Sequence, residues 1–286
     1  MLSPEQIEHF RMQGYLVLDP CLEAGQVEAL TERVRQIAEG EIDLPDGSIE
    51  YEPGATGRRM ESLRKINFPS RYDPFFVDHA RHSRLLDPIV DLIGPDVKLF
   101  GDQLFMKPPG GIEKTYHQDC PYFSIEPMAM VSAWVALDDV TEDNGCIYVV
   151  PGSHKLGFFD HYDDHGQWAG RVSDTDLESV PVGDALSLTG PAGSVTVIHS
   201  GILHHSRPNH SDRWRPLLIC GYASADAFPF VPHYSIGTRS KYAFQMARGE
   251  PAKYAHLESL RLRIPPDWSR GYHSIFEDQK GERRSA

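Results

Sequence analysis

The run VKLFGDQLFMK, from Val97 to Lys107, opens the part of the chain that decides its fold. Further short β-rich runs follow it, each bounded by turn residues, at 113–117, 130–137, 146–150, 194–200, 202–206 and 216–223. The triplets DNG at 143–145 and PGS at 151–153 are strong turn signals between these runs. Regularly spaced short strands without helices between them are typical of an antiparallel barrel or a two-sheet jelly roll. We therefore expect a mainly β core, either a barrel or a jelly roll, over residues 97–224.

Helices are expected to flank this core on its N-terminal side. Ser3 followed by Pro4 is a typical helix start, with a capping hydroxyl and a proline at the first helical position, and the helix is expected to reach about Met12. Apolar residues at three- and four-residue spacing predict an amphipathic helix within 22–38, and a further helix is expected over 83–92.

The length of 286 residues does not by itself decide between one domain and two. Because the β-rich runs form one continuous series, we expect a single domain over residues 1–286. Residues 1–96 would form its helical N-terminal support, and about 155–190 a polar insertion across one mouth of the barrel. Residues 225–286 are expected to form a C-terminal cover that ends in a charged tail.

The charge balance excludes several classes of partner. The chain has 41 acidic and 28 basic residues and a formal net charge of −13, whereas nucleic acids and anionic membranes are bound chiefly through Lys and Arg. No run of about 18 apolar residues occurs that could cross a membrane. The N-terminus is polar where a signal peptide needs an apolar run, and the four cysteines form no CxxC pair. We expect a cytoplasmic protein that acts on a small molecule; its oligomeric state stays open.

A histidine and a carboxylate two residues apart, His117 and Asp119, form the first candidate site. In an extended strand, residues i and i+2 project from the same face, so both side chains would point into one space. Alone, such a pair is equally compatible with a surface turn. A third ligand is expected from 202–206, where alternation lets only one of His204 and His205 face the pair, and we choose His204. Two histidines and one carboxylate on one face of a metal suit a non-heme Fe(II) oxygenase.

Arg215 is the candidate anchor for an anionic co-substrate. It stands eleven residues after His204 and precedes an apolar strand. A buried guanidinium can hold a carboxylate through two parallel hydrogen bonds, and so fix a dicarboxylate whose other end chelates the metal. Spacing alone leaves Arg213 as an alternative anchor, and it leaves a surface salt bridge as an alternative role for Arg215.

Several motifs together resemble the phytanoyl-CoA dioxygenase family. They are YHQDCPYF from Tyr116, AWVALD from Ala133, NGC from Asn144, VPGSH from Val150, and HHSRPN from His204 followed by Arg215. The resemblance covers about residues 97–224, and the pattern GYLV at 14–17 is also similar to the opening of that family. It implies a double-stranded β-helix, which is a jelly-roll, cupin-like core. This core would hold Fe(II), with 2-oxoglutarate and O₂ as co-substrates.

The resemblance also implies roles for individual residues. Those that match the family's iron ligands are His117, Asp119 and His204. Those that match its 2-oxoglutarate contacts are Arg215, Ser206, Trp134, Gln103 and Lys65, the last two less closely. Aromatic candidates for a substrate pocket, which are equally compatible with core packing, are Phe105, Tyr116, Tyr122 and Phe123.

The implied reaction is hydroxylation of an unactivated carbon of a small-molecule metabolite, with release of succinate and CO₂. Because Asp119 fills the coordination position that a halide would need, hydroxylation is favoured over halogenation. Desaturation, demethylation and ring closure stay open, since the outcome depends on where the substrate carbon is held. The acidic chain offers no extended basic patch for a CoA moiety. The alternative is a non-catalytic, or 2-oxoglutarate-independent, cupin-type metal-binding protein.

Overall fold

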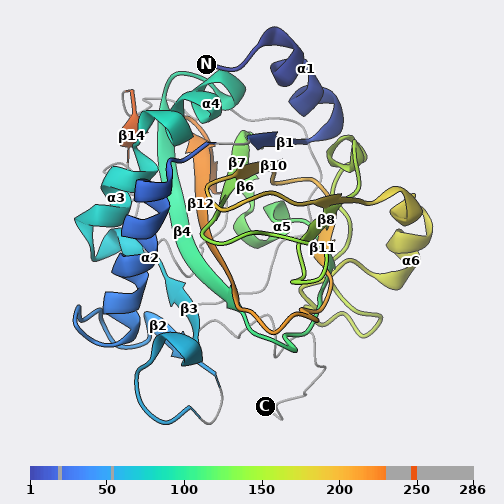
Figure 1. Cartoon of the computed structure of the whole chain (residues 1–286). Helices are drawn as coiled ribbons and strands as arrows, with labels where there is room; N and C mark the ends of the chain where they lie inside the picture. Colours follow the sequence, from blue (N-terminus) through green and yellow to red (C-terminus); the bar gives the residue numbers. More distant parts are fainter. Residues whose placement is uncertain (19–20, 53–54, 230–245, 250–286) are drawn as a thin grey trace.

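The computed structural model describes residues 1–18, 21–52, 55–229 and 246–249, and its centre is built from antiparallel β-sheets (Figure 1). The larger sheet runs in the order β1-β10-β7-β12-β4-β3-β2, with β14 paired to β4. The smaller sheet runs β5-β11-β8-β9, and β13 pairs with β6 in a separate ribbon. The mainly β jelly-roll core that the sequence predicted is confirmed.

The strands are short except for two. Those of the larger sheet are β1 (Tyr15–Leu18), β10 (Val195–His199), β7 (Met130–Ala136), β12 (Arg215–Ser224), β4 (Val97–Lys107), β3 (Leu63–Asn67), β2 (Ile49–Tyr51) and β14 (Met246–Arg248). Those of the smaller sheet and the ribbon are β5 (Lys114–His117), β11 (His204–Ser206), β8 (Ile147–Val149), β9 (Leu186–Leu188), β13 (Phe228–Pro229) and β6 (Ile125–Glu126).

The long strands β4 and β12 pair along their whole length, from Arg215 opposite Lys107 to Ser224 opposite Val97. Side chains alternate between the two faces of β4. Leu104 packs in the main hydrophobic core, whereas Phe105 and Lys107 line a cavity on the other face. The same alternation continues across the sheet and gives the cavity its floor.

Helices and short 3₁₀ turns surround the sheets. The α-helices are α1 (Pro4–Gln13), α2 (Ala24–Ala38), α3 (Pro74–Ala80), α4 (Ser83–Ile93), α5 (Cys120–Phe123) and α6 (Asp174–Glu178). The 3₁₀ turns are η1 (Met60–Ser62), η2 (Pro69–Arg71), η3 (Ser153–Lys155) and η4 (Val182–Asp184). The sequence predicted α1, α2 and α4 but not α3, α5 or α6.

Helices α2, α3 and α4 lie on the side of β4 that is away from the smaller sheet (Figure 1). Val34 and Ile37 of α2 and Leu85 and Ile89 of α4 are fully buried there, in the same core as Leu104 of β4. Burying a side chain of this size stabilises a fold by about 2 kcal/mol. The helical layer therefore holds one face of the larger sheet and leaves the other face free to form a site.

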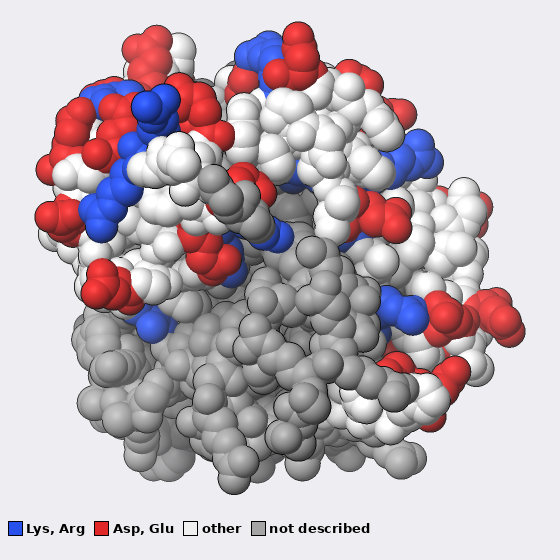
Figure 2. All heavy atoms as spheres, turned by 90° about the horizontal axis from the view of Figure 1, so that it is seen from below, with Lys and Arg blue, Asp and Glu red and all other residues white. Residues whose placement is uncertain are grey.

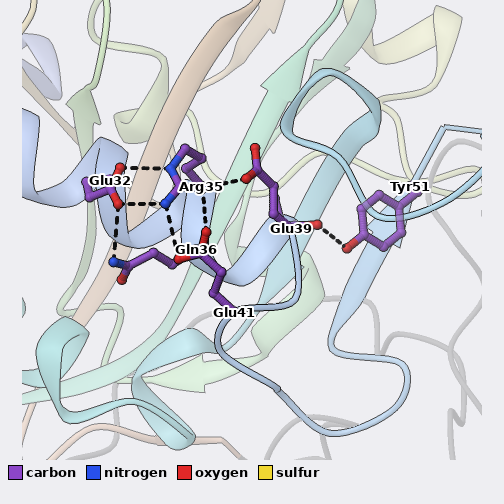
Figure 3. Close-up of polar contacts among 7 residues, drawn as sticks. Glu32, Arg35, Gln36, Glu39, Glu41 and Tyr51 are labelled. Atoms are coloured by element: carbon purple, nitrogen blue, oxygen red, sulfur yellow. Dashed lines mark hydrogen bonds and ion pairs between the residues drawn. The ribbon is translucent and has the colours of Figure 1, made fainter.

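The end of α2 is fastened to the segment that follows it by a polar cluster around Arg35 (Figure 3). The guanidinium of Arg35 donates to Glu32 at 2.8 and 2.9 Å, to Glu41 at 2.8 and 3.2 Å, and to Glu39. The Tyr51 hydroxyl donates to the carbonyl of Ala38 at 2.8 Å. Exposed ion pairs contribute little to stability, so this cluster serves mainly to set the path of the chain after α2.

Two expected segments differ from the structure. The insertion expected at about 155–190 ends earlier, because Leu186–Leu188 form β9 of the smaller sheet. The C-terminal cover expected over 225–286 lies mostly outside the described residues; of it, β14 adds a short strand beside β4. Within the described part of the chain, no helix has both the length and the apolar character that crossing a bilayer requires.

Candidate metal centre

Three side chains converge where β5 and β11 pair. His117 ends β5, Asp119 follows two residues later, and His204 begins β11 directly opposite His117. The Nε2 atoms of His117 and His204 lie 3.9 and 3.7 Å from Oδ1 of Asp119. One potential ligand atom from each residue lies within 4.8 Å of the other two. Since nitrogen and oxygen ligands bind transition-metal ions at about 2 Å, one ion fits among them.

Both imidazole rings are held with Nε2 directed at this point. Nδ1 of His117 lies 2.9 Å from the carbonyl of Thr115, and Nδ1 of His204 lies 3.0 Å from that of Ile202. A carbonyl only accepts, so each Nδ1 carries the proton and each Nε2 keeps its lone pair. Burial, with the neighbouring His204 as a smaller cause, holds the pKa of His117 well below its usual value. His117 is therefore neutral at physiological pH, as a metal ligand must be.

Asp119 is oriented by a serine on the opposite sheet. The hydroxyl of Ser132, on β7, donates to Oδ2 of Asp119 at 3.2 Å. The other carboxylate oxygen, Oδ1, is the one nearest both histidines. A hydrogen bond to one oxygen of a ligating carboxylate fixes which oxygen meets the metal.

Gln118, between two of these residues, is fully buried and ties the site to neighbouring loops. Its amide nitrogen donates to the carbonyls of Gly157 at 2.9 Å and Gly201 at 2.7 Å, and its amide oxygen accepts from the Phe159 N–H at 2.9 Å. Its backbone N–H donates to Nε2 of His161 at 3.0 Å. The ends of β5 and β11 are thus held against each other and against the segment that follows η3.

A cavity of about 850 Å³ lies beside the three residues, and all of them line it. Inward-facing residues of the larger sheet contribute much of its wall: Gln103, Phe105 and Lys107 of β4, Ser132 and Trp134 of β7, and Arg215, Leu217 and Ile219 of β12. Cavities of about 300–1,000 Å³ are typical for small-molecule sites. There is room beside the candidate metal position for more than one small molecule.

One end of the cavity is basic. Arg215 is 5% exposed, and its Nε and Nη1 atoms have no hydrogen-bond partner among the described residues. Burial lowers the pKa of Arg215 to about 10, so the guanidinium stays charged at neutral pH. The alternative anchor, Arg213, is exposed and donates to Asp138 at 2.6 Å. Of the two arginines, Arg215 is therefore the one that lines the cavity.

The sequence of this chain matches the model of a known family over most of the β core and the helices before it. That family is described as phytanoyl-CoA dioxygenase (PhyH), and the match spans residues 10–217. The chain belongs to the phytanoyl-CoA dioxygenase family. The family that its motifs resemble is therefore confirmed.

Curated relatives and solved structures agree with this membership. A probable alpha-ketoglutarate-dependent hypophosphite dioxygenase of Stutzerimonas stutzeri is 29% identical over 279 residues, with 96% of each chain covered. Phytanoyl-CoA dioxygenase domain-containing protein 1 of Bos taurus is 30% identical over 259 residues, covering 75% of this chain and 87% of the relative. The predicted class, a 2-oxoglutarate-dependent dioxygenase, agrees with the family and with these relatives.

The fold is shared with solved oxygenases. The crystal structure of EctD from S. alaskensis with bound Fe has a TM-score of 0.69 at 23% identity, covering 93% of this chain and 88% of that one. The non-heme alpha-ketoglutarate-dependent carbocyclase SnoK from nogalamycin biosynthesis has a TM-score of 0.65 at 23% identity, covering 88% and 94%. At these identities the likeness shows the fold alone.

In this member of the phytanoyl-CoA dioxygenase family, the other expected co-substrate contacts also line the cavity. Trp134 packs edge-on against His204, with ring centroids 5.8 Å apart, and its indole Nε1 is buried without a hydrogen-bond partner in the described part of the chain. Gln103 and Lys65 line the cavity as well, and Nζ of Lys65 lies 4.8 Å from the centroid of the Phe105 ring. Burial lowers the pKa of Lys65 to about 8.

Of the four aromatic candidates for a substrate pocket, Phe105, Tyr122 and Phe123 line the cavity. The hydroxyl of Tyr122 donates to the carbonyl of Gly170 at 2.6 Å. The expectation for Tyr116 is corrected, because this residue does not line the cavity. Its ring lies against His205, with centroids 4.2 Å apart, and its hydroxyl donates to the carbonyl of Val182. As the neighbour of His117 on one strand, it points to the other face of β5.

Three residues of the site were missed by the sequence interpretation: Gln118, Ser132 and Lys107. Alternation could have found two of them. Ser132 stands two residues before Trp134, and Lys107 four after Gln103, so each shares a strand face with an expected contact. No local pattern marks Gln118, whose three partners come from segments distant in sequence.

Proposed function

We propose that this chain binds one Fe(II) ion through His117, Asp119 and His204 and hydroxylates an unactivated carbon of a small molecule. The observation that carries the proposal is the convergence of these side chains, in which Nε2 of His204 is buried without a hydrogen-bond partner among the described residues. Burying an unsatisfied nitrogen is costly, and a metal ion would remove that cost. Two imidazoles and one carboxylate on a single face are the donor set that suits Fe(II) in oxygenases.

The co-substrate is proposed to be 2-oxoglutarate, with its distal carboxylate on Arg215. The unpaired guanidinium atoms of Arg215 offer the fork geometry that a carboxylate accepts in two parallel bonds. Ser206, two residues after His204 on β11, would add a hydroxyl to the same carboxylate, and Trp134 an indole N–H. Gln103 and Lys65 are proposed as further contacts from their places in the cavity wall.

When bound, Fe(II) with 2-oxoglutarate and O₂ supplies the oxidative decarboxylation that gives succinate and CO₂ and the oxidation of a substrate C–H bond. The residues of this chain position the co-substrate and the substrate. The anchor would fix the dicarboxylate in one orientation, and Phe105, Tyr122 and Phe123 would hold the substrate and keep water from the reacting carbon. The carbon held nearest the metal would be the one that is oxidised.

The substrate is proposed to be a small molecule without a CoA group. On the face shown in Figure 2, the Lys and Arg side chains of the described residues are interspersed with Asp and Glu and form no continuous basic patch. Nucleic acids and anionic membranes are unsuitable partners, because they are bound through Lys and Arg and the chain has a net charge of −13. The relative named as a hypophosphite dioxygenase adds phosphorus oxyanions as a second class of candidate, in which a P–H bond would be oxidised in place of a C–H bond. All four cysteines are free and buried, which supports work in the reducing cytoplasm.

The experiment that tests this function has two stages. Under anaerobic conditions, Fe(II) and 2-oxoglutarate together should give a weak visible charge-transfer band with the protein. In air, candidate metabolites are then scored by the succinate that they cause to form. A protein that binds metal but gives no band would be a 2-oxoglutarate-independent or non-catalytic cupin-type protein, and the proposal would be abandoned.

A further inference from the structure

Lys107 is a second buried cation beside Arg215. It ends β4, its Cα is the partner of Arg215 on β12, and it is 8% exposed. Its Nζ donates to the hydroxyl of Ser206 at 2.9 Å and to the carbonyl of Arg207. Three strands, β4, β11 and β12, therefore bring two positive charges and one hydroxyl to the same end of the cavity.

No carboxylate of the described residues forms an ion pair with either charge, and Glu113 acts on Lys107 only beyond ion-pair distance. Burial, with the charge of Arg215 as the next cause, lowers the pKa of Lys107 to about 7. Like charges buried together without a counter-ion are unfavourable, so the arrangement calls for an anion that enters from outside the chain.

The space for Lys107 is made by a glycine turn. At Gly145, with φ +78°, a side chain would put Cβ 2.9 Å from Nζ of Lys107 and 2.6 Å from the carbonyl of Arg207. Both the backbone conformation and the close approach require glycine here. Its neighbour Asn144 fixes the turn through hydrogen bonds to Thr141 at 2.9 and 3.2 Å and to the carbonyl of Asp139 at 2.7 Å. Lys107 is thus enclosed by an ordered turn and does not extend into solvent.

We propose that Lys107 is a second cationic contact of the co-substrate: its Nζ pairs with the carboxylate of 2-oxoglutarate that Arg215 grips, while Ser206 completes the cradle. The inference rests on the proposed function and adds a residue that the motifs did not indicate. Lys107 can donate to one further partner, because an ammonium has three protons and Ser206 and Arg207 accept only two of them. The other possible role is structural, in which those two bonds are all that Lys107 contributes.

A comparison of two ligands separates these roles. Dissociation constants are measured anaerobically on the Fe(II)-loaded protein for 2-oxoglutarate and for 2-oxopentanoate, which chelates metal in the same way but carries a methyl group in place of the distal carboxylate. Lys107→Met should weaken 2-oxoglutarate about tenfold to a hundredfold, the range for one charge-assisted hydrogen bond. It should change the affinity for 2-oxopentanoate less than about threefold, since no carboxylate is there to lose the contact.

Matched variants keep the test interpretable. Lys107→Arg retains the charge and should recover most of the selectivity for 2-oxoglutarate over 2-oxopentanoate. Lys155→Met removes an exposed lysine on η3 that does not line the cavity, and should behave as the unaltered protein. Fe(II) affinity and the thermal unfolding midpoint are recorded for each variant, and if Lys107→Met does not fold, Lys107→Gln takes its place.

The outcomes point in different directions. Selective loss of 2-oxoglutarate affinity in Lys107→Met supports the inference. Equal affinities in the unaltered protein and the variant, or equal weakening of both ligands, would overturn it and leave Lys107 a structural residue. If the unaltered protein itself binds no 2-oxoglutarate, the proposed function fails first, and the anchor fails with it.

Discussion

His204 and His117 face each other as Cα partners across β11 and β5, with ring centroids 4.1 Å apart. Each ring donates its Nδ1 proton to the carbonyl two residues before it in the chain, that of Thr115 or Ile202. The same local contact thus occurs twice, and it turns both Nε2 atoms toward Asp119. The strand register keeps both imidazoles on the same face, because a shift of one residue would move either of them to the opposite face of the sheet.

Replacing Asp119 with alanine should abolish substrate-dependent succinate formation and weaken Fe(II) binding by more than a hundredfold. The reason is that loss of a ligand exceeds the tenfold to about hundredfold cost of losing a residue that only orients one. Anaerobic calorimetric titration with Fe(II) measures the affinity. Asp184→Ala, an exposed aspartate in η4 outside the cavity, is the control. Retention of full metal affinity in Asp119→Ala would remove Asp119 from the ligand set.

Replacing Ser132 with alanine tests the orientation of Asp119. The change removes the hydrogen bond from Ser132 to Oδ2 at 3.2 Å but leaves the three ligands in place. Fe(II) affinity should fall by about tenfold, the lower end of the range for residues that orient a ligand. Ser132→Thr keeps the hydroxyl and should recover the affinity. An alanine variant with unchanged affinity would show that Oδ1 needs no help to reach the metal.

The period-two pattern of the strands made much of this site predictable. It placed His117 and Asp119 together and let only one of the two adjacent histidines face them. The position of Arg215 then favoured His204 over its neighbour, which instead stacks on Tyr148 with ring centroids 5.1 Å apart. Applied one step further, the same rule would have excluded Tyr116 from the cavity. Arg215 could not be separated from Arg213 in this way, because both lie on the same face in an alternating run. Burial decided between them, and burial depends on the whole fold.

Contacts between distant segments were beyond the sequence. Lys107 meets Ser206 only because β4 and β11 end at the same place, and Gln118 finds its partners at Gly157 and Gly201. Helix α3 was missed because its seven residues, which begin at Pro74, are too few for a periodic pattern. Strand β9 was counted as part of the insertion because its sequence, Leu-Ser-Leu, has only three residues.

Replacing Gln118 with leucine should destabilise the protein by about 3 kcal/mol, since three backbone groups that are buried or partly buried lose their partner at once. These groups are the carbonyls of Gly157 and Gly201 and the N–H of Phe159. Equilibrium urea unfolding measures the change, and hydrogen exchange should quicken at Phe159. Gln167→Leu, at an exposed position, serves as the control and should leave stability within about 0.5 kcal/mol. Equal stability of the two variants would mean that these bonds are replaced by water.

Affinity for 2-oxoglutarate should depend on pH through Lys107, whose pKa of about 7 in the empty site is lowered by burial and then by Arg215. A bound carboxylate favours the charged lysine, so binding takes up a proton and raises this pKa. The affinity is therefore greatest below pH 7 and falls as pH rises through that value, by up to about tenfold per pH unit.

The groups that act directly on Lys107 leave this profile intact up to about pH 7.5, above which Lys65, a proposed contact with a pKa of about 8, would add a slope of its own in every variant. The thiol of Cys146 stays protonated, because burial raises its pKa to about 11, and Arg215 stays charged with a pKa of about 10. Glu113 is the carboxylate whose charge favours the protonated lysine, and it is present in every variant compared. Dissociation constants measured from pH 6 to 7.5 should show the slope in the unaltered protein. Lys107→Arg should bind tightly across the range without the slope, and Lys107→Met weakly without it. A slope that survives in Lys107→Met would assign the proton to another group.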